Sequence, residues 1–272
     1  MILKEAVAVL AGAGRLRGVG ASTARMLAKR GCNLLINTLK NQQQAEELAD
    51  ECRGFGVETQ VYMGDLTNAS ACHEMANLVE SKWGRADIIV NSLGYTKGAP
   101  YEQLDKLTEE DFAKMYAVNG TAPFLMAQAF QSLLRASGDG CIVNVSSAAG
   151  ITGKGSSIAY AASKGATNTL TLALSQALSP EVRVNAVCPS FIDSSWWDET
   201  FAGREDKYRQ LVKSMQRNNL LNRVLTPDDV ARTIMGIIDN PCMSGELIRL
   251  DSGAHVGQAN AREIDASPKP KA

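Results

Sequence analysis

Short apolar runs alternate along this chain with longer segments in which apolar residues recur at helical spacing. The first run, residues 6–12 (AVAVLAG), is almost entirely apolar, and the segment 18–31 that follows it is amphipathic. A continuous apolar run is typical of a strand buried on both faces, whereas a period near 3.6 residues predicts a helix with one buried face. The opening of the chain therefore predicts a strand followed by a helix.

The same alternation continues to residue 251. Because parallel strands need helical crossovers between them, this order favours a parallel sheet covered by helices on both faces. We expect an α/β fold with a single Rossmann-like doubly wound sheet, spanning residues 1–257 as one dinucleotide-binding domain. Strands are predicted at 6–12, 32–38, 58–66, 86–94, 141–147, 182–190 and 245–251, and helices at 18–31, 41–56, 69–84, 108–137, 157–178 and 227–239.

One segment, about 193–225, breaks the alternation. It carries Trp196, Trp197, Phe201 and Tyr208 among charged residues and follows the carboxyl end of a strand. A long segment in this place is a candidate substrate lid, and a pair of amphipathic surface helices is the open alternative. The two tryptophans suit either an apolar substrate pocket or a contact between subunits. The polar, proline-bearing residues 258–272 predict a flexible C-terminal tail.

The composition narrows the classes of partner. The 272 residues are 45% hydrophobic and 21% charged, with a net charge of −1, which gives no reason to expect nucleic acid or membrane. Six scattered cysteines without a CxxC pair, and only two histidines, predict neither a metal site nor a disulfide framework. The first apolar run is too short for a signal peptide or a membrane span. We expect a cytoplasmic protein.

A glycine-rich turn follows the first predicted strand. The glycines allow unusual backbone angles and close approach of a pyrophosphate, and the helix beginning near Gly18 presents free N–H groups to that anion. The turn does not fit GxGxxG or a P-loop, but the segment from Gly14 to Gly20 fits GxxxGxG. Dinucleotide contacts are therefore predicted at Gly12, Gly14, Gly18 and Gly20.

The end of the second predicted strand bears on the choice of cofactor. Enzymes that select NAD place an acidic residue there to bind the ribose 2′-hydroxyl, whereas residues 37–41 (NTLKN) contain no carboxylate. A 2′-phosphate would meet no repulsion from Thr38 and Lys40, and Arg17, with Arg15 or Lys40, would supply cations for it. The sequence favours NADP(H), and NAD(H) remains the alternative.

Tyr160 and Lys164 lie four residues apart in a predicted helix and so share one face. A phenol loses its proton near pH 10, and a neighbouring cation lowers that pKa. Such a pair can exchange a proton with an alcohol or a carbonyl near neutral pH, which is general acid–base chemistry.

Together with Asn119 and Ser147, this pair makes the chain resemble the short-chain dehydrogenase/reductases. The resemblance covers nearly all of residues 4–256 and is strongest to 3-oxoacyl-carrier-protein reductases and related carbonyl reductases. It includes the glycine turn, the YxxxK pair, NSLG in place of the NNAG stretch, RVNAVCPSFIDSS and GELIRLDSG. In this family, helices corresponding to 108–136 and 158–178, and the C-terminal strand, form the interfaces of a homotetramer, which the resemblance implies here.

The resemblance implies a role for each catalytic residue. Tyr160 would be the general acid in reduction and the base in oxidation, and Lys164 would lower its pKa and hold the nicotinamide ribose. Ser147 would hydrogen-bond the substrate oxygen, and Asn119 would support a water linked to Lys164. The residues themselves agree with the last role, because Pro123 has no N–H for the Asn119 carbonyl, which leaves that carbonyl free to accept from water.

Further cofactor contacts are implied by the same resemblance. Asp65 would lie against the adenine, and the other contacts would come from Asn91, Gly94, Pro189, Ile192 and Ser194. The chain departs from the family pattern where Ser190 replaces a glycine, where Ser194 replaces a threonine, and in a glycine turn that is two residues longer. Whether Gly12 or Gly14 leads the motif stays open.

These observations predict an NADP(H)-dependent oxidoreductase that moves hydride between nicotinamide and a small carbonyl or secondary alcohol substrate. An NAD-linked alcohol dehydrogenase of the same fold is the nearest alternative. A non-catalytic dinucleotide sensor is the alternative from another class, and it is disfavoured because Tyr160 and Lys164 are both present.

Overall fold

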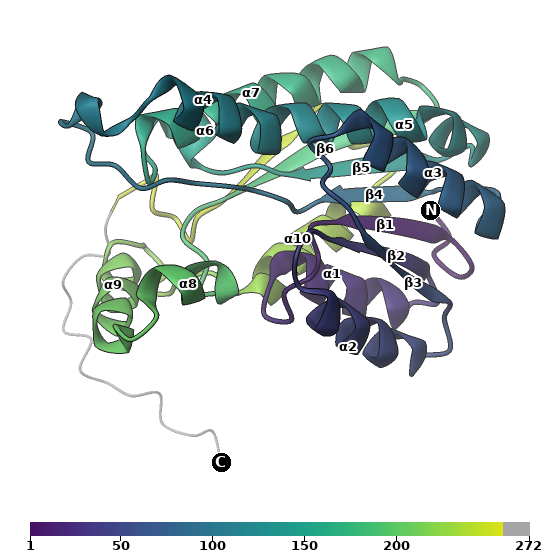
Figure 1. Cartoon of the computed structure of the whole chain (residues 1–272), viewed down its shortest axis with the longest axis horizontal. Coiled ribbons are helices and arrows are strands. Elements are labelled where there is room, and N and C mark those ends of the chain that lie inside the picture. The colour runs from purple at the N-terminus through teal and green to yellow at the C-terminus, as the bar shows by residue number, and fades with distance from the viewer. Residues whose placement is uncertain (258–272) are drawn as a thin grey trace.

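A parallel sheet forms the centre of the molecule (Figure 1). The computed structural model describes residues 1–257, so the predicted flexible tail, 258–272, lies outside the described residues. Within that range the sheet has seven strands in the order β3-β2-β1-β4-β5-β6-β7. They are β1 Val7–Ala11, β2 Asn33–Thr38, β3 Thr59–Met63, β4 Ile88–Asn91, β5 Gly140–Val145, β6 Val182–Pro189 and β7 Leu247–Leu250.

Helices cover both faces of this sheet, as the alternation in the sequence predicted. One face carries α1 (Val19–Ala28), α2 (Gln42–Arg53) and α10 (Pro227–Asp239) (Figure 1). The other face carries α3 (Ala69–Trp83), α4 (Glu109–Tyr116), α5 (Ala122–Ala136), α6 (Ala149–Thr152) and α7 (Ile158–Ala177). The predicted doubly wound α/β fold is confirmed. No helix within residues 1–257 combines the length and the apolar character that crossing a membrane requires.

The strands divide their side chains between two apolar cores. In β1, Ala8 and Leu10 belong to the core under α1, α2 and α10, while Val7 and Val9 belong to the core under α3, α5 and α7. Successive side chains of a strand point to opposite faces, and here both faces are covered. This double burial explains why the strands appear in the sequence as continuous apolar runs.

The long helix predicted at 108–137 contains a local break. It begins with a capping box, in which the Thr108 hydroxyl and the Asp111 carboxylate each accept from the other residue's backbone N–H. After α4 comes a π-helical turn, Ala117–Thr121, and then α5. Single π turns inside α-helices occur where an extra residue is accommodated, often at functional sites. Here the turn contains Asn119, one of the predicted catalytic residues.

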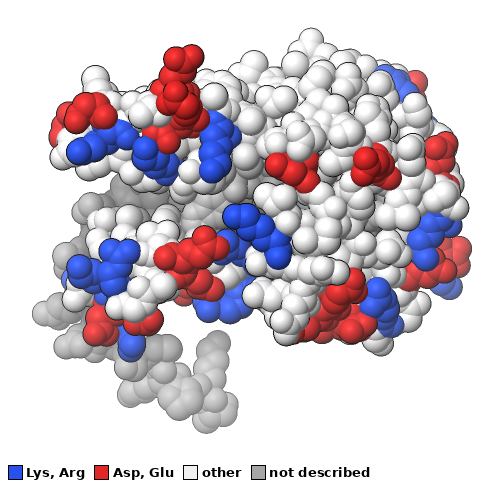
Figure 2. All heavy atoms as spheres, in the orientation of Figure 1, with Lys and Arg blue, Asp and Glu red and all other residues white. Residues whose placement is uncertain are grey.

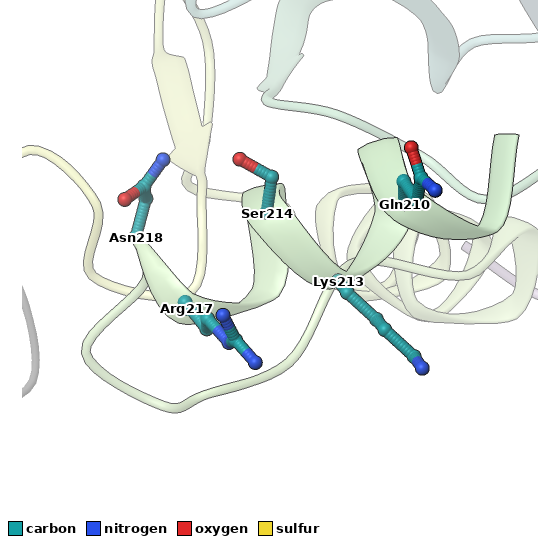
Figure 3. Close-up of a pocket in the computed structure, with 5 residues that line it drawn as sticks. All are labelled: Gln210, Lys213, Ser214, Arg217 and Asn218. Carbon is teal, nitrogen blue, oxygen red and sulfur yellow. The ribbon is translucent and has the colours of Figure 1, made fainter. Parts of the chain in front are cut away.

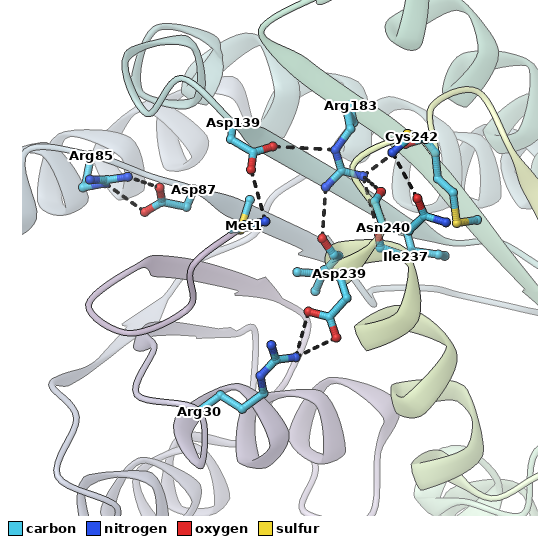
Figure 4. Close-up of polar contacts among 12 residues, drawn as sticks. Met1, Arg30, Arg85, Asp87, Asp139, Arg183, Ile237, Asp239, Asn240 and Cys242 are labelled. Atoms are coloured by element: carbon cyan, nitrogen blue, oxygen red, sulfur yellow. Dashed lines mark hydrogen bonds and ion pairs between the residues drawn. The ribbon is translucent and has the colours of Figure 1, made fainter.

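Arg183, at the start of β6, fastens the far end of α10 to the sheet (Figure 4). Its guanidinium is buried and donates four hydrogen bonds of 2.9 to 3.2 Å to backbone carbonyls at that helix end. A cation suits the negative end of a helix, whose last carbonyls have no partner inside the helix. The acceptors are the carbonyls of Ile237, Ile238, Asn240 and Met243. This contact lies at the amino end of β6, opposite the carboxyl ends of the strands.

Candidate active site

A cleft of about 530 Å³ lies beyond the carboxyl ends of the strands. It is centred on β1 and β4, which are neighbours in the sheet although two strands separate them in the chain. In open α/β sheets, ligands bind at such a switch point. Figure 2 shows a hollow between the rim over α4 and the rim over α8 (Asp198–Phe201), with basic and acidic side chains on both rims. This cleft is the candidate active site.

Most of the residues predicted from the sequence line this cleft, and three do not. The glycine turn, the end of β2, the end of β5, α7 and the loop after β6 all reach it. Arg17, Asn91 and Asn119 are absent from its lining. Those that line it are Gly12, Gly14, Gly18, Gly20, Thr38, Lys40, Asp65, Gly94, Ser147, Tyr160, Lys164, Pro189, Ile192 and Ser194.

The glycine turn needs both of its leading glycines, for different reasons. Gly12 has a φ of 78°, and a Cβ placed on it would lie 2.7 Å from the Leu93 Cα. Gly14 has an ordinary φ, but its Cβ would lie 2.0 Å from the Thr38 Oγ1. α1 then begins after Gly18 without a side-chain cap. The first N–H groups of α1 therefore face the cleft without a side-chain acceptor, as a phosphate site requires.

The end of β2 is held by Asn37, whose role the sequence did not reveal. Its side-chain oxygen accepts from the Gly12 N–H at 3.2 Å, and its nitrogen donates to the Gly64 carbonyl at 3.1 Å. This buried amide ties the ends of three neighbouring strands together. Beside it, Thr38 is buried while Lys40 is exposed at the edge of the cleft. The only sequence signal was a polar residue near the end of an apolar strand.

The two arginines of the glycine turn contact the segment 193–199 across the cleft. Arg15 donates from Nη1 to the Ser195 carbonyl and from Nη2 to Glu199, both at 2.6 Å. The Arg17 guanidinium lies 4.0 Å from Asp193, and its side chain is 66% exposed. Arg17 therefore does not line the cleft in this structure, and its predicted contact with the cofactor stays a prediction.

Tyr160 and Ser147 meet on one wall of the cleft. α7 begins at Ser157, whose hydroxyl caps the helix by accepting from the Tyr160 N–H at 3.2 Å. Burial raises the pKa of Tyr160, and a hydrogen bond with Ser147 lowers it by less. The Ser147 hydroxyl also accepts from the Ala149 N–H at 3.1 Å. At neutral pH the phenol is therefore protonated and can donate.

Lys164 is buried next to this pair and donates to the Val145 carbonyl at 3.0 Å. Burial lowers its pKa to about 8. The expectation that Lys164 lowers the pKa of Tyr160 is corrected, because in this structure the dominant effect on Tyr160 is burial, which raises its pKa. The lysine is 4% exposed, so its ammonium loses hydration and gains only one carbonyl acceptor.

Asn119 lies behind the cleft rather than in it. Its side-chain nitrogen donates to the Ser163 hydroxyl at 2.8 Å and to the Tyr95 carbonyl at 2.9 Å, and its oxygen accepts from the Tyr95 N–H at 2.8 Å. Its own carbonyl, expected to be free for a water, accepts from the Thr167 hydroxyl at 2.8 Å. In this structure Asn119 fastens the loop after β4 to α7.

Asn91 also lies outside the lining of the cleft. Its side chain is buried and donates to the Asn144 side-chain oxygen at 2.8 Å. This bond joins the ends of β4 and β5. The side chain predicted to contact the cofactor is therefore part of the frame that holds two cleft-forming strands together.

The irregular segment predicted as a lid forms the wall opposite Tyr160. We call residues 190–217 the lid wall; it contains η3 (Ser195–Trp197), α8 and α9 (Glu205–Arg217). Four aromatic rings pack inside it with centroids 5.3 to 6.5 Å apart, and Trp196 and Trp197 line the cleft. The four rings are Phe191, Trp197, Phe201 and Tyr208. The segment is thus helical, as the alternative of surface helices predicted, and it also lines the cleft, as the alternative of a substrate lid predicted.

A second hollow, of about 340 Å³, lies along α9. Its lining is polar and comes from one helix and the residue after it: Gln210, Lys213, Ser214, Arg217 and Asn218. Figure 3 shows these side chains pointing in several directions, with the two cations away from Ser214 and Asn218. They do not converge on a common point, so the larger cleft is the better candidate for chemistry.

Comparison with known proteins agrees with this geometry. A family model described as enoyl-(acyl carrier protein) reductase matches residues 12–255. The chain belongs to the short-chain dehydrogenase/reductase family. It is therefore an oxidoreductase of this family, as the sequence predicted.

The relatives span nearly the whole chain. A 3-oxoacyl-acyl-carrier-protein reductase of Thermotoga maritima is 28% identical over 256 residues, which cover 93% of this chain and 99% of the relative. An uncharacterized oxidoreductase of the same organism is 30% identical, covering 91% and 96%. A short-chain dehydrogenase/reductase structure from Burkholderia xenovorans superposes with a TM-score of 0.85 at 32% identity, covering 93% and 99%. An NAD⁺-bound xylitol dehydrogenase shares the fold, with a TM-score of 0.83 at 24% identity.

The cleft fits the nicotinamide dinucleotide that short-chain dehydrogenase/reductases use. Two residues that line it, Ser190 and Ser195, each have a buried hydroxyl oxygen with no hydrogen-bond partner within residues 1–257. Buried polar groups without partners are costly, so such groups in a cleft are suited to a polar ligand. Ser195 lies next to the glycine turn, since its carbonyl is bound by Arg15 and its N–H by the Arg17 carbonyl at 3.3 Å. Uncapped helix N–H groups and two serines with unpartnered hydroxyls thus belong to the lining of one cleft.

Several further residues line the cleft that sequence reasoning did not assign to it. On the side of α4 and the loop after β4 they include Leu93, Tyr95, Lys114 and Val118. Lys114 and Val118 are four residues apart, which places them on one face of a helix. That spacing was visible in the sequence, but nothing there showed which face turns toward the cleft.

Proposed function

We propose that this short-chain dehydrogenase/reductase uses NADP(H) to reduce a ketone or aldehyde, or to oxidise the corresponding alcohol, with Tyr160 as the general acid or base. The observation that carries this proposal is that Tyr160, Ser147 and Lys164 line the same cleft as the glycine turn. Proton donor, oxygen-binding hydroxyl and phosphate-binding backbone therefore share one solvent-accessible space at the switch point of the sheet.

Each of these residues has a defined task in the proposed reduction. The bound nicotinamide would supply the hydride. The Ser147 hydroxyl donates a hydrogen bond to the substrate oxygen as negative charge develops there. The Tyr160 phenol, kept protonated by burial, delivers its proton to that oxygen. Lys164, which lines the cleft beside them, would hold the ribose of the nicotinamide, as the family resemblance implies.

The preference for NADP(H) is supported by the charges at the end of β2. Thr38, Leu39, Lys40 and Asn41 line the cleft there and include no carboxylate. Lys40 is exposed, with no Asp or Glu within 4.0 Å of its ammonium among residues 1–257. Such a lysine is suited to a 2′-phosphate. Arg15 reaches the same space from the glycine turn.

A cofactor comparison tests this proposal. The purified protein is assayed with a panel of ketones, with NADPH and with NADH, and the variant Lys40→Ala is compared with Lys106→Ala, an exposed lysine outside the cleft. NADPH should give the higher kcat/KM, and Lys40→Ala should raise the KM for NADPH about tenfold while changing that for NADH much less. A higher kcat/KM with NADH would refute the NADP(H) preference. The absence of turnover with either cofactor would refute the reductase proposal.

We also propose a homotetrameric, cytoplasmic enzyme. Large apolar side chains are 36 to 43% exposed on α4, α5 and α7, the helices that the family resemblance places at an interface. They are Phe112, Tyr116, Phe124 and Leu172. A subunit contact would cover these exposed apolar side chains. All six cysteines are free, and five are buried, which suits a reducing compartment. Sedimentation of the purified protein tests the assembly.

A further inference from the structure

One charged side chain in the cleft has no task in the proposed chemistry. Lys114 lines the cleft from α4, and its ammonium lies 4.3 Å from the centroid of the Tyr95 ring. Tyr95 follows Gly94 and also lines the cleft, and its backbone is held on both sides by Asn119. The ammonium therefore rests on a fixed aromatic surface within the cleft.

This lysine is not neutralised by a carboxylate. Of the two acids one helical turn before it, Asp111 is already bound by Lys97 at 2.6 Å and by the Thr108 cap, and Glu110 is hydrogen-bonded to Thr108. In the part of the chain that the structure describes, no Asp or Glu oxygen lies within 4.0 Å of the Lys114 ammonium. Its charge is therefore available to a ligand.

The contact with Tyr95 does not prevent Lys114 from binding a ligand. A cation over an aromatic face at an exposed site contributes about 0.5 to 1 kcal/mol and leaves the three N–H donors of the ammonium largely directed elsewhere. The ring positions the lysine, while a ligand with oxygen acceptors would satisfy its donors. A purely structural lysine would instead be expected to pair with a carboxylate or to leave the cleft for solvent.

The surroundings of Lys114 define the kind of ligand. On this side of the cleft, the lining from the loop after β4, α4, the end of β5 and α7 carries two cations, Lys114 and Lys164, and no carboxylate. Across the cleft, the one acid of the lid wall in the lining, Glu199, is bound by Arg15. The same cleft also has an apolar lining from Leu93, Val118, Trp196 and the Tyr95 ring. An anion attached to a short apolar body matches this arrangement.

We propose that the substrate carries an anionic group, a carboxylate or a phosphate, in addition to its carbonyl, and that Lys114 binds this group. The inference rests on the proposed carbonyl-reductase function and names the substrate class for that site. Tyr160 and Ser147 act on the carbonyl, while Lys114 selects the anion and so orients the other end of the molecule.

Paired substrates test this inference. Acetoacetate is compared with its neutral ethyl ester, and dihydroxyacetone phosphate with dihydroxyacetone, using wild type, Lys114→Met, Lys114→Arg and the control Lys106→Met, an exposed lysine outside the cleft. In Lys114→Met, the ratio of kcat/KM for the anionic over the neutral substrate should fall about tenfold, which corresponds to about 1.4 kcal/mol. Lys114→Arg should keep most of the ratio, and Lys106→Met should keep all of it. Whichever pair shows the larger fall identifies carboxylate or phosphate as the group bound.

A binding measurement separates failure of this inference from failure of the proposed function. The quenching of tryptophan fluorescence, to which Trp196 in the cleft contributes, gives the Kd of each compound without turnover. For each variant, the Kd and the kcat/KM of the anionic substrate are divided by those of the neutral one. If these ratios in Lys114→Met stay within twofold of wild type, the role of Lys114 is overturned, even if the protein is an active reductase. Absence of turnover with every ketone would overturn the proposed function, and the Kd ratio would then decide the inference alone. Unfolding temperatures confirm that each variant is folded.

Discussion

The wall of the cleft that carries Tyr160, Ser147 and Lys164 is held by buried hydrogen bonds, whereas the lid wall is held by the packing of four aromatic rings and by partly exposed ion pairs. In α7 eight residues are buried, and polar side chains such as Ser163 bond to neighbouring elements. In α8 and α9 no residue is buried, and the lid wall is fixed to the glycine turn by Arg15 and by a longer contact of Arg17. Proton transfer needs fixed geometry, which the first wall provides; substrates vary in shape, which the second can accommodate.

The largest expected difference between the walls is in catalysis. Tyr160→Phe removes the proposed acid and should lower kcat about 10²- to 10⁴-fold, with cofactor binding retained. Its counterpart in the lid wall is Tyr208→Phe, which removes the 2.6 Å hydrogen bond from the phenol to Asp193. That bond contributes about 1 kcal/mol, so kcat/KM should fall at most about tenfold. Steady-state kinetics and a titration with NADPH measure both variants.

Equal activity losses in the two tyrosine variants would remove the distinction between the walls. Full activity in Tyr160→Phe would support the alternative of a non-catalytic dinucleotide sensor, or a different proton donor. Retained NADPH affinity is required in each case, because a variant that loses the cofactor reports on the binding site rather than on proton transfer.

The second expected difference concerns pH and stability. Burial lowers the pKa of Lys164 to about 8 from an ordinary 10.5. Between these values the unfolded chain binds a proton that the folded chain does not, so folding becomes more favourable as the pH rises through this window. Relative to Lys164→Met, the wild-type free energy of unfolding should rise by on the order of 3 kcal/mol between about pH 7.5 and 10.5, since one pKa unit corresponds to about 1.4 kcal/mol.

Urea unfolding of wild type and Lys164→Met, without cofactor, gives the free energy of unfolding of each protein across this pH range. The contributions of the other titrating groups cancel in the difference between the two values. The matched control from the lid wall is Lys213→Met, whose lysine is exposed on α9. The free energy of unfolding of Lys213→Met should differ from that of wild type by an amount that does not change with pH. A pH-independent difference for Lys164→Met would mean that the lysine is hydrated in the folded protein.

The smallest expected effect comes from the contact that joins the lid wall to the glycine turn. The side chains of Arg15 and Glu199 are 36% and 84% exposed, so their ion pair contributes less than about 1 kcal/mol. Glu199→Gln should leave the free energy of unfolding within that margin and lower the KM for NADPH about twofold, because one carboxylate near an anionic cofactor is removed. A higher KM for NADPH would show that the ion pair holds the site open for the cofactor.

The sequence predicted the fold and most of the cleft because both depend on local patterns. Apolar runs and helical periods specify the elements, and the ends of neighbouring parallel strands meet at one edge whatever the details of packing. The glycines of the turn, Tyr160 and Ser147 follow from that logic and line the cleft. The pKa of Tyr160 did not follow, because it is raised by burial, which only the packed structure reveals.

Side-chain direction was the part that the sequence could not give. Arg17 belongs to the glycine turn but turns toward Asp193, and Asn119 lies in the π-helical turn but is bonded to Tyr95 and Ser163. Each outcome depends on a partner from a distant part of the chain. Lys114 is the opposite case: the sequence did not place it in the cleft, but the packing of α4 against α7 does.

The order of apolar and polar residues by itself determined seven strands, their helical crossovers and a ligand-binding edge within residues 1–257, because backbone hydrogen bonding and burial act over short stretches. Only the tertiary structure decided which side chains face the cleft, which ones hold its walls and which pKa values shift. Those properties depend on desolvation and on partners brought together from across the chain, and neither is encoded in any single segment.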